Sequence, residues 1–239
     1  MRILVIQHDA DKGLGLFVRP LAEAAQELDV QFAGHGELEL AGHAAVIALP
    51  GIANPDEETF AVTSTRDVLR EALRQELPIL GICLGAELLA EAAGAATRPC
   101  PHEWGYSEVS LAAAGRDDEL LGGLPEQFDV FQAHTYCCDL PANAVALAHS
   151  PGGLQAFRVG DTAWGIQFHP EPSLEMLDGW TRALGHLMEA AGVDPAATRR
   201  LGRRHVPEWS ERAAGMGRRF AAVARAAEDQ RSTRTSNPP

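Results

Sequence analysis

The sequence predicts an α/β protein built on a doubly wound, mostly parallel sheet. Through the first ninety residues, short apolar runs alternate with amphipathic segments. Parallel strands need crossover helices, so this β-α-β-α-β-α order favours a parallel sheet. Short strands and turns replace the alternation between residues 107 and 167, which indicates a smaller antiparallel section. In sheets of this kind, ligands bind outside the carboxyl ends of the strands.

The individual elements are predicted from the spacing of their apolar residues. Runs of four to six apolar residues predict strands, and repeats at intervals of three and four predict helices. In the parallel part we expect strands at 2–7, 44–49 and 78–82 and helices at 16–28, 65–76 and 84–93. In the antiparallel part we expect strands at 107–112, 129–133, 144–150, 154–159 and 163–167, followed by a helix at 173–191.

The C-terminal part is predicted to be a helical extension. Asp194 followed by Pro195 has the form of an N-cap with proline at the first helical position. Helical patterns then continue to about residue 227, with expected breaks near Pro207 and residues 215–217. We therefore divide the chain into a main domain at 1–190, a helical extension at 191–231 and a disordered tail at 232–239.

Composition and charge exclude several classes of function. The chain has 239 residues, with 33 acidic and 20 basic side chains and a formal charge of −13. This charge repels nucleic acids and anionic membranes, so neither is expected as a partner. No apolar run approaches the roughly 20 residues of a membrane span, and no signal-peptide pattern opens the chain, so a cytoplasmic location is expected. The four cysteines lack CxxC spacing, and neither a disulfide framework nor a metal site is predicted.

The segment 80–87, LGICLGAE, carries the sharpest local signal. Cys83 stands where a predicted strand turns into a predicted helix, with a glycine two residues away on either side. Small neighbours are needed at such a turn, which is the cysteine form of a nucleophile elbow. The helix start should lower the pKa of the Cys83 thiol and offer the Leu84 N–H to a developing oxyanion. The alternative interpretation is a buried structural cysteine.

The segment 165–171, GIQFHPE, ends another predicted strand. His169 can accept the thiol proton. Glu171, separated from it by one proline, can orient the imidazole and stabilise its charged form. A His-x-Glu sequence alone is common in solvated turns, but two reactive motifs at strand ends favour a shared site.

Together these motifs resemble the class I glutamine amidotransferases, a family with a Cys-His-Glu triad. The resemblance covers most of residues 1–190, and GICLG followed by FHPE is highly specific to the family. The chain looks like a stand-alone member related to the amidotransferase domain of GMP synthase. The resemblance implies a flavodoxin-like three-layer α/β/α sandwich. It also implies that Cys83 attacks a side-chain amide and forms a γ-glutamyl thioester, with His169 as base and then acid and Glu171 as its orienting group.

The same resemblance assigns roles to residues around the triad. The turn 49–54, LPGIAN, matches the family's oxyanion loop, so the Gly51 N–H is the expected second donor beside Leu84. The segment 131–136, FQAHTY, matches the loop that presents backbone groups to the substrate, which assigns Thr135 and Tyr136 to substrate contact. His134 either tunes this site or is held by backbone hydrogen bonds. In the matching segment 103–106, EWGY, the two aromatic residues either support the site or pack in the core.

Three departures from the family pattern bear on specificity. Glu87 replaces a glutamine that helps to hold the substrate, and a carboxylate accepts hydrogen bonds but cannot donate them. This change favours a substrate with an additional amine, such as a γ-glutamyl amine. Pro50 and Ile52 alter the oxyanion loop, and proline offers no N–H. Thr135 replaces a loop glycine, and because threonine adopts fewer backbone conformations than glycine, we expect either a more restricted backbone conformation or a changed loop here.

The sequence therefore predicts an amide hydrolase that releases ammonia or an amine from glutamine or a γ-glutamyl compound. No cofactor is expected. Synthetase machinery such as a G-x-x-x-x-G-K-[ST] loop is missing from the sequence, so a synthetase or acceptor-domain protein is a possible partner. One alternative is a catalytically weakened regulatory or binding subunit, which Glu87 and Pro50 keep open. Another is a different cysteine-elbow protein, such as a glyoxalase or chaperone relative, against which the FHPE segment argues.

Overall fold

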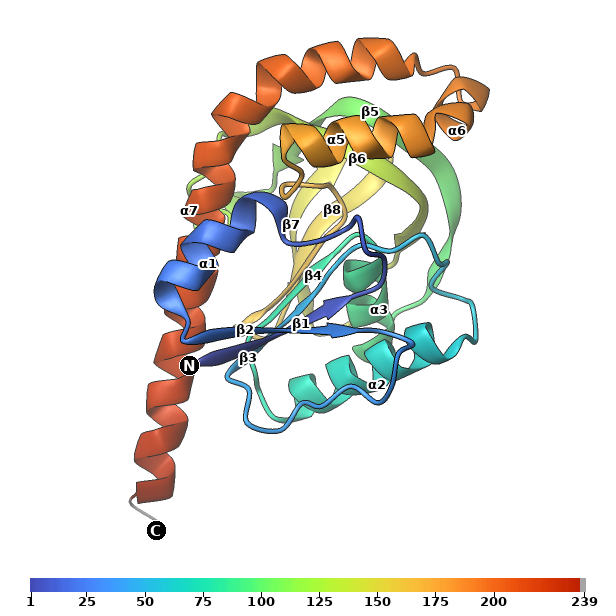
Figure 1. The fold of residues 1–239 in the computed structure, drawn as a ribbon. Helices are drawn as coiled ribbons and strands as arrows, with labels where there is room; N and C mark the ends of the chain where they lie inside the picture. Colours follow the sequence, from blue (N-terminus) through green and yellow to red (C-terminus); the bar gives the residue numbers. More distant parts are fainter. Residues whose placement is uncertain (237–239) are drawn as a thin grey trace.

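A computed structural model describes residues 1–236 and contains one nine-stranded sheet (Figure 1). The strands lie in the order β2-β1-β3-β4-β9-β8-β7-β5-β6. Their bounds are β1 Arg2–Gln7, β2 Glu27–Phe32, β3 Ala45–Ala48, β4 Ile79–Ile82, β5 Thr97–Leu111, β6 Gln127–Cys138, β7 Ala144–Ser150, β8 Gly153–Val159 and β9 Ala163–Ile166. The pairings from β2 to β9 are parallel, and those from β9 to β6 are antiparallel.

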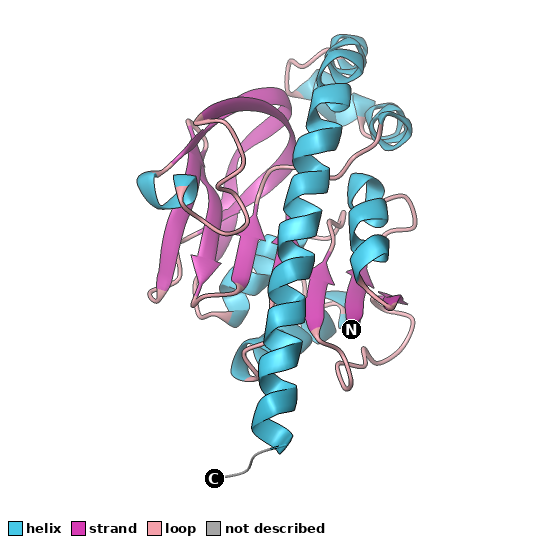
Figure 2. Cartoon of the chain, turned by 90° about the vertical axis from the view of Figure 1, so that its left-hand side faces the viewer, coloured by secondary structure: helices cyan, strands magenta, loops and turns pink. Residues whose placement is uncertain are grey.

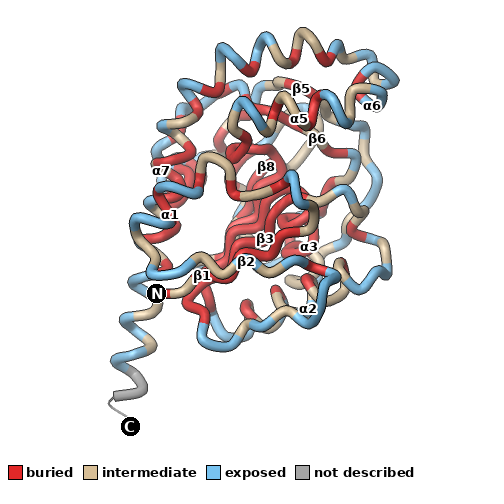
Figure 3. The backbone as a smooth tube through the Cα atoms, in the orientation of Figure 1, coloured by how far each residue is buried: buried red, intermediate tan, exposed pale blue. Residues whose placement is uncertain are grey.

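Helices cover both faces of the parallel half, because its strands are apolar on both sides. In β1, Ile3 and Val5 face the cluster that includes the helix α1 (Val18–Ala24), while Leu4 and Ile6 face the cluster that includes α2 (Phe60–Arg74) and α3 (Leu84–Ala92). The strands β1, β3 and β4 are almost entirely buried and form part of the red centre of the molecule in Figure 3. The predicted α/β sandwich is confirmed.

The antiparallel half is larger than the sequence indicated. Four of the eight strand pairings are antiparallel, and β5 and β6 are 15 and 12 residues long. A short helix, α4 (Ala113–Arg116), follows β5, while α5 (Leu174–Ala183) and α6 (Gly185–Ala190) follow β9. The predicted helix at 173–191 is therefore two helices that meet at Leu184.

Two predictions near the N-terminus need correction. The expected helix at 16–28 is a short 3₁₀ turn (Gly15–Phe17) followed by α1, and its last residues belong to the edge strand β2. The helix expected from residue 65 begins at Phe60, because the Thr59 side chain accepts a hydrogen bond from the Val62 N–H and caps it.

The C-terminal helix α7 (Pro195–Ser236) is continuous, so the breaks predicted near Pro207 and residues 215–217 are wrong. Figure 1 shows it bending between the part beside α5 and the part beside α1, and Pro207 lies in the helix interior. The glycines allow close packing. A Cβ at Gly202 would lie 2.1 Å from Leu177, and one at Gly217 would lie 2.8 Å from Pro20.

The predicted disordered tail at 232–239 is also corrected, since α7 includes residues 232–236. Residues 237–239 lie outside the described part of the chain. Figure 2 shows α7 running along one side of the sheet, and its buried Trp209, Met216 and Phe220 join the same apolar cluster as the strands. The domain boundary at residue 190 stays a prediction. Among the helices of residues 1–236, none has the length and apolar character needed to cross a membrane.

Candidate active site

One cavity of about 330 Å³ lies where the strand ends of the parallel half meet the C-terminal part of β6. The carboxyl ends of parallel strands share one edge, so the segments that follow β1, β3, β4 and β9 converge there. The cavity is lined by seven of the eight predicted site residues: Gly51, Cys83, Leu84, Glu87, Thr135, Tyr136 and His169. The eighth, Glu171, lies directly behind His169.

Cys83 occupies the turn between β4 and α3 in a rare backbone conformation. Its φ is 50° and its ψ is −111°, outside the regions that non-glycine residues normally adopt. Glycine is required at positions 81 and 85, because a side chain at either position would clash with the backbone. A Cβ at Gly81 would lie 2.4 Å from the Gly85 carbonyl oxygen, and one at Gly85 would lie 2.1 Å from the Ala48 carbonyl oxygen. The local geometry is that of a nucleophile elbow.

His169 lies at the same edge, after the strand that pairs with β4. Ile82 is in register with Ile166, and the Cys83 N–H donates to the Ile166 carbonyl at 2.8 Å. The His169 N–H donates to the Phe131 carbonyl at 2.9 Å, which ties this residue to β6. The two reactive side chains therefore line one cavity from neighbouring strands.

Glu171 orients the imidazole. Its Oε1 lies 2.8 Å from His169 Nδ1, and the carboxylate side chain is fully buried. Among the described residues, His169 Nε2 is buried and has no hydrogen-bond partner. With Nδ1–H donated to the carboxylate, Nε2 is left as the acceptor that a general base needs.

The pKa of the Cys83 thiol is raised, contrary to the lowering expected from the helix start. Burial is the main cause, since the residue is only 6% exposed, and the nearby Glu87 and Glu171 carboxylates add to it. The Leu84 backbone N–H donates to the sulfur and, with Lys12, acts in the opposite direction. The thiol is therefore protonated in the free protein and needs a base for activation.

The second oxyanion loop is tightly held. A Cβ at Gly51 would lie 2.5 Å from Leu84 Cδ2 and 3.0 Å from the His8 Cβ, so the turn has no room for a side chain. The next amide, Ile52 N–H, donates to Asp9 Oδ2 at 2.8 Å. Among residues 1–236, no group accepts a hydrogen bond from the Gly51 N–H.

Glu87 is a buried carboxylate that faces the cavity from α3. It is 3% exposed, and its Oε1 accepts a hydrogen bond from Gln167 Nε2 at 2.9 Å. Burial raises the pKa of Glu87, while the Gln167 hydrogen bond and the charges of His134 and His169 lower it. Within the described chain, the Gln167 Oε1 oxygen is buried and unpartnered.

The segment 131–136, expected to be a loop, lies within the strand β6, where it pairs with β5, and His134 supports it from behind. Its Nδ1 lies 3.0 Å from the Tyr136 carbonyl, and its Nε2 lies 3.3 Å from Glu103 Oε2. Hydrogen bonds and the charge of His134 lower the pKa of Glu103 against the effect of burial. The Tyr136 hydroxyl donates to Asp56, and this hydrogen bond joins β6 to the segment after the Gly51 turn. His134 is bonded to the backbone, as one interpretation expected, and it also lines the cavity, so its tuning of the site stays a prediction.

The remaining aromatic residues separate into two groups. Trp104 lines the cavity, whereas Tyr106 packs against Phe131 and His205 in the core. Further lining residues that the sequence analysis did not assign to the site include Lys12, Trp180, Leu184 and Leu187. They stand in no recognisable motif, and tertiary folding alone brings α5 and the loop after β1 to the cavity. The presence of the only lysine of the chain beside a strand end was the one available signal.

Comparisons with known proteins agree with this arrangement. A family model for class I glutamine amidotransferases matches residues 13–179. GMP synthase (glutamine-hydrolysing) of Porphyromonas gingivalis is 35% identical over 125 residues, which cover 51% of this chain and 24% of the relative. The chain therefore spans about a quarter of that protein. A shorter relative, named as one subunit of the glutamine-hydrolysing GMP synthase of Ignicoccus hospitalis, is 31% identical over 150 residues, covering 56% of this chain and 79% of the relative.

A solved structure shows the same fold over nearly the whole chain. The glutamine amidotransferase of Thermotoga maritima superimposes with a TM-score of 0.82 and 25% sequence identity, over 92% of this chain and 98% of that one. The family match covers more than half of the chain and contains both reactive motifs. The protein belongs to the class I glutamine amidotransferase family.

Proposed function

We propose that this protein hydrolyses the side-chain amide of glutamine or of a γ-glutamyl amine through a thioester on Cys83. The observation that carries the proposal is the shared cavity. An elbow cysteine and a histidine backed by a buried glutamate line it from neighbouring strands. This is the arrangement that nucleophilic acyl transfer requires.

The first half of the reaction forms the thioester. His169 Nε2 takes the thiol proton, and the Cys83 sulfur attacks the amide carbonyl carbon. The carbonyl oxygen becomes an oxyanion that accepts hydrogen bonds from the Leu84 and Gly51 N–H groups, each contributing on the order of 3 kcal/mol to lowering the barrier. The imidazolium, stabilised by Glu171, returns the proton to the nitrogen. The C–N bond breaks, and ammonia or an amine leaves.

The second half releases the acid and restores the enzyme. His169 takes a proton from water, whose oxygen attacks the thioester carbonyl. The C–S bond breaks, a γ-carboxylic acid forms, and the proton on His169 returns to the Cys83 sulfur. A thiol with a raised pKa and the attacking water both hold their protons, so each half depends on His169 as base.

The Glu87 carboxylate favours a substrate that carries an amine. Glu87 accepts hydrogen bonds where a family member normally has a glutamine, and it is held toward the cavity by Gln167. Thr135 and Tyr136 line the cavity from β6 and are proposed to contact the glutamyl backbone. A partner that accepts ammonia is also proposed, since a relative of similar size is named as one subunit of GMP synthase. We retain the cytoplasm as the proposed location.

The raised pKa of Cys83 and the buried Glu87 favour a second candidate, a catalytically weakened regulatory or binding subunit. The deciding experiment measures ammonia or amine released from glutamine and from a panel of γ-glutamyl amides. Hydrolysis of at least one compound, lost in Cys83→Ala, supports the enzyme, and mass spectrometry should detect the γ-glutamyl adduct on Cys83. No turnover and no adduct with any compound would leave regulation or binding as the function.

A further inference from the structure

Lys12 is a buried cation in the wall of the cavity that holds Cys83 and His169. It is 6% exposed and is the only lysine of the chain. Lysine is almost never this buried unless its ammonium group meets an anion. It stands in the loop after β1, at the strand edge where ligands of parallel sheets bind.

The protein uses only part of the hydrogen-bonding capacity of the Lys12 ammonium group. Its Nζ donates to Asp11 Oδ1 at 2.9 Å, whereas Asp9 Oδ2 lies 3.8 Å away, beyond hydrogen-bond distance. An ammonium group has three N–H donors. The Asp11 side chain is 54% exposed, so water screens this pair and weakens it. The ammonium group therefore keeps donors for a ligand in the cavity.

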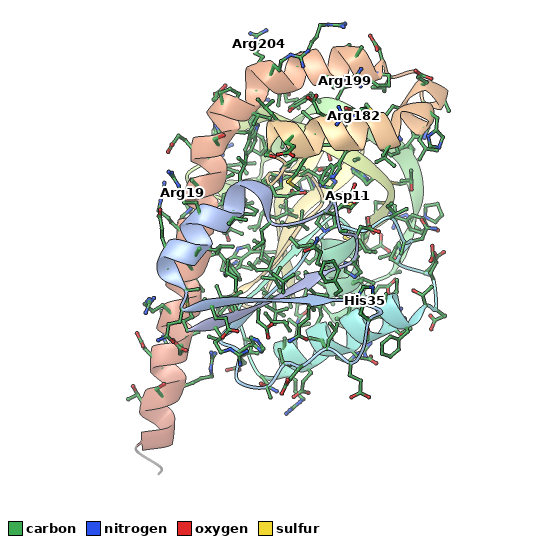
Figure 4. The ribbon with its side chains drawn as sticks, in the orientation of Figure 1. Asp11, Arg19, His35, Arg182, Arg199 and Arg204 are labelled. Atoms are coloured by element: carbon green, nitrogen blue, oxygen red, sulfur yellow. The ribbon has the colours of Figure 1, made fainter. Side chains whose placement is uncertain are left out.

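The loop that carries Lys12 is fixed in place from several sides. Trp180 Nε1 donates to the Asp11 carbonyl at 3.0 Å, and Figure 4 shows Asp11 on this loop next to α5. Lys12 Nζ lies 5.8 Å from the centre of the Trp180 ring, and the same tryptophan packs edge-on against His169 at 5.3 Å. The cation is thus held close to the reacting groups before any substrate arrives.

The cavity also contains the opposite charge at Glu87, on another wall. A small cavity with one cation and one carboxylate is complementary to a molecule that carries both a carboxylate and an ammonium group. We propose that Lys12 binds a carboxylate of the substrate and thereby selects anionic or zwitterionic γ-glutamyl compounds. This inference rests on the proposed function. The carboxylate belongs either to the α-carbon of the glutamyl part or to the amine that is released.

Two pairs of compounds separate these sources, because each pair differs by a single carboxylate. Glutamine is compared with its α-amide, and γ-glutamylglycine with γ-glutamylglycinamide. Lys12→Met should raise KM about tenfold to a hundredfold for the member whose carboxylate Lys12 binds and leave the KM of its amide counterpart unaffected, while any change in kcat that acts through the Cys83 thiol should be equal for both members. Lys12→Arg should recover part of the loss. Arg19→Met is the control, because it also removes one cation but lies exposed in α1 outside the cavity lining, and it should not raise KM.

Binding measurements keep this test independent of turnover. The four compounds are titrated calorimetrically into Cys83→Ala protein with and without Lys12→Met. The expected result is the same selective loss of affinity. Equal losses for both members of each pair, loss in Arg19→Met as large as in Lys12→Met, or no binding of any compound would overturn the role of Lys12. Absent turnover with selective binding would instead count against the proposed hydrolysis alone.

Discussion

The thiol at the elbow shows how strongly single side chains set the chemistry of this site. A cysteine at a helix start is expected to be acidic, but here burial and two carboxylates outweigh the Leu84 N–H and Lys12. Sequence motifs identify Cys83, His169 and Glu171 by their order in the chain. They do not report the charge that tertiary contacts place around the sulfur.

The first prediction separates Cys83 from the other cysteines. Cys83→Ser should lower kcat for γ-glutamyl amide hydrolysis by at least about 10³-fold, since the attacking group is lost while the fold is kept. Cys100, Cys137 and Cys138 are free thiols outside the cavity lining, so their serine variants should keep most of the activity. Equal damage from Cys137→Ser would show that the site is assigned to the wrong cysteine.

The second prediction concerns Glu87. Glu87→Gln removes a carboxylate that raises the pKa of Cys83, so a larger share of the thiol is ionised at a given pH. Alkylation of Cys83 by iodoacetamide should become faster near pH 8, and its pH profile should shift to lower pH. Hydrolysis of free glutamine should also improve. Glu91→Gln is the control, because Glu91 lies one helical turn away and pairs with Arg66 outside the cavity. An unchanged profile would contradict this account of Glu87.

At the scale of elements, edge strands were the hardest part to predict. β2 alternates polar residues such as Glu27 and Asp29 with apolar ones, which is a strand pattern, but the helix predicted at 16–28 includes its first two residues and no element is predicted for the rest. β5 contains Pro99 and Pro101, which usually argue against a strand. Both lie in the part that pairs with β6 alone, where a missing N–H on the free side is tolerated. The buried strands β1, β3 and β4 carried clear apolar runs.

The third prediction tests the packing at the elbow. Gly85→Ala should lower the free energy of unfolding by about 1–3 kcal/mol, because its Cβ would lie 2.1 Å from the rigid Ala48 carbonyl. The matched control is Gly179→Ala in α5, where nothing lies within 4 Å of the added Cβ. That variant should be neutral or stabilised by up to about 1 kcal/mol, from the helix propensity of alanine. Denaturant unfolding followed by circular dichroism measures both, and a neutral Gly85→Ala would contradict the close approach.

At the scale of the whole molecule, α7 joins the two halves of the sheet. Its Trp209 packs edge-on against Phe128, and its Phe220 packs against Trp164 of β9. The helix was predicted to break because proline and glycine usually end helices. Here Gly202 and Gly217 let it approach α5 and α1 closely, which a local pattern does not report. Local sequence patterns also gave no sign of Lys12 and Trp180 as site residues, since only the folded chain brings them to the cavity.

The fourth prediction tests whether α7 is part of the core. Trp209 is 4% exposed, and its Nε1 donates to the Asp129 carbonyl at 2.7 Å. Trp209→Ala should lower the free energy of unfolding by about 3–5 kcal/mol. Trp209→Phe keeps most of the apolar contact and should lose less. Stability unchanged in Trp209→Ala would mean that α7 unfolds separately from the sheet.

The strained backbone conformation of Cys83 implies that the site is kept at a cost in stability. A non-glycine residue in such a conformation costs on the order of 1–3 kcal/mol, a cost that glycine avoids. Cys83→Gly should therefore raise the melting temperature while abolishing turnover, and a lower melting temperature would contradict this. Selection for stability alone would therefore favour glycine at position 83, and the strained cysteine found there is consistent with the proposed hydrolysis.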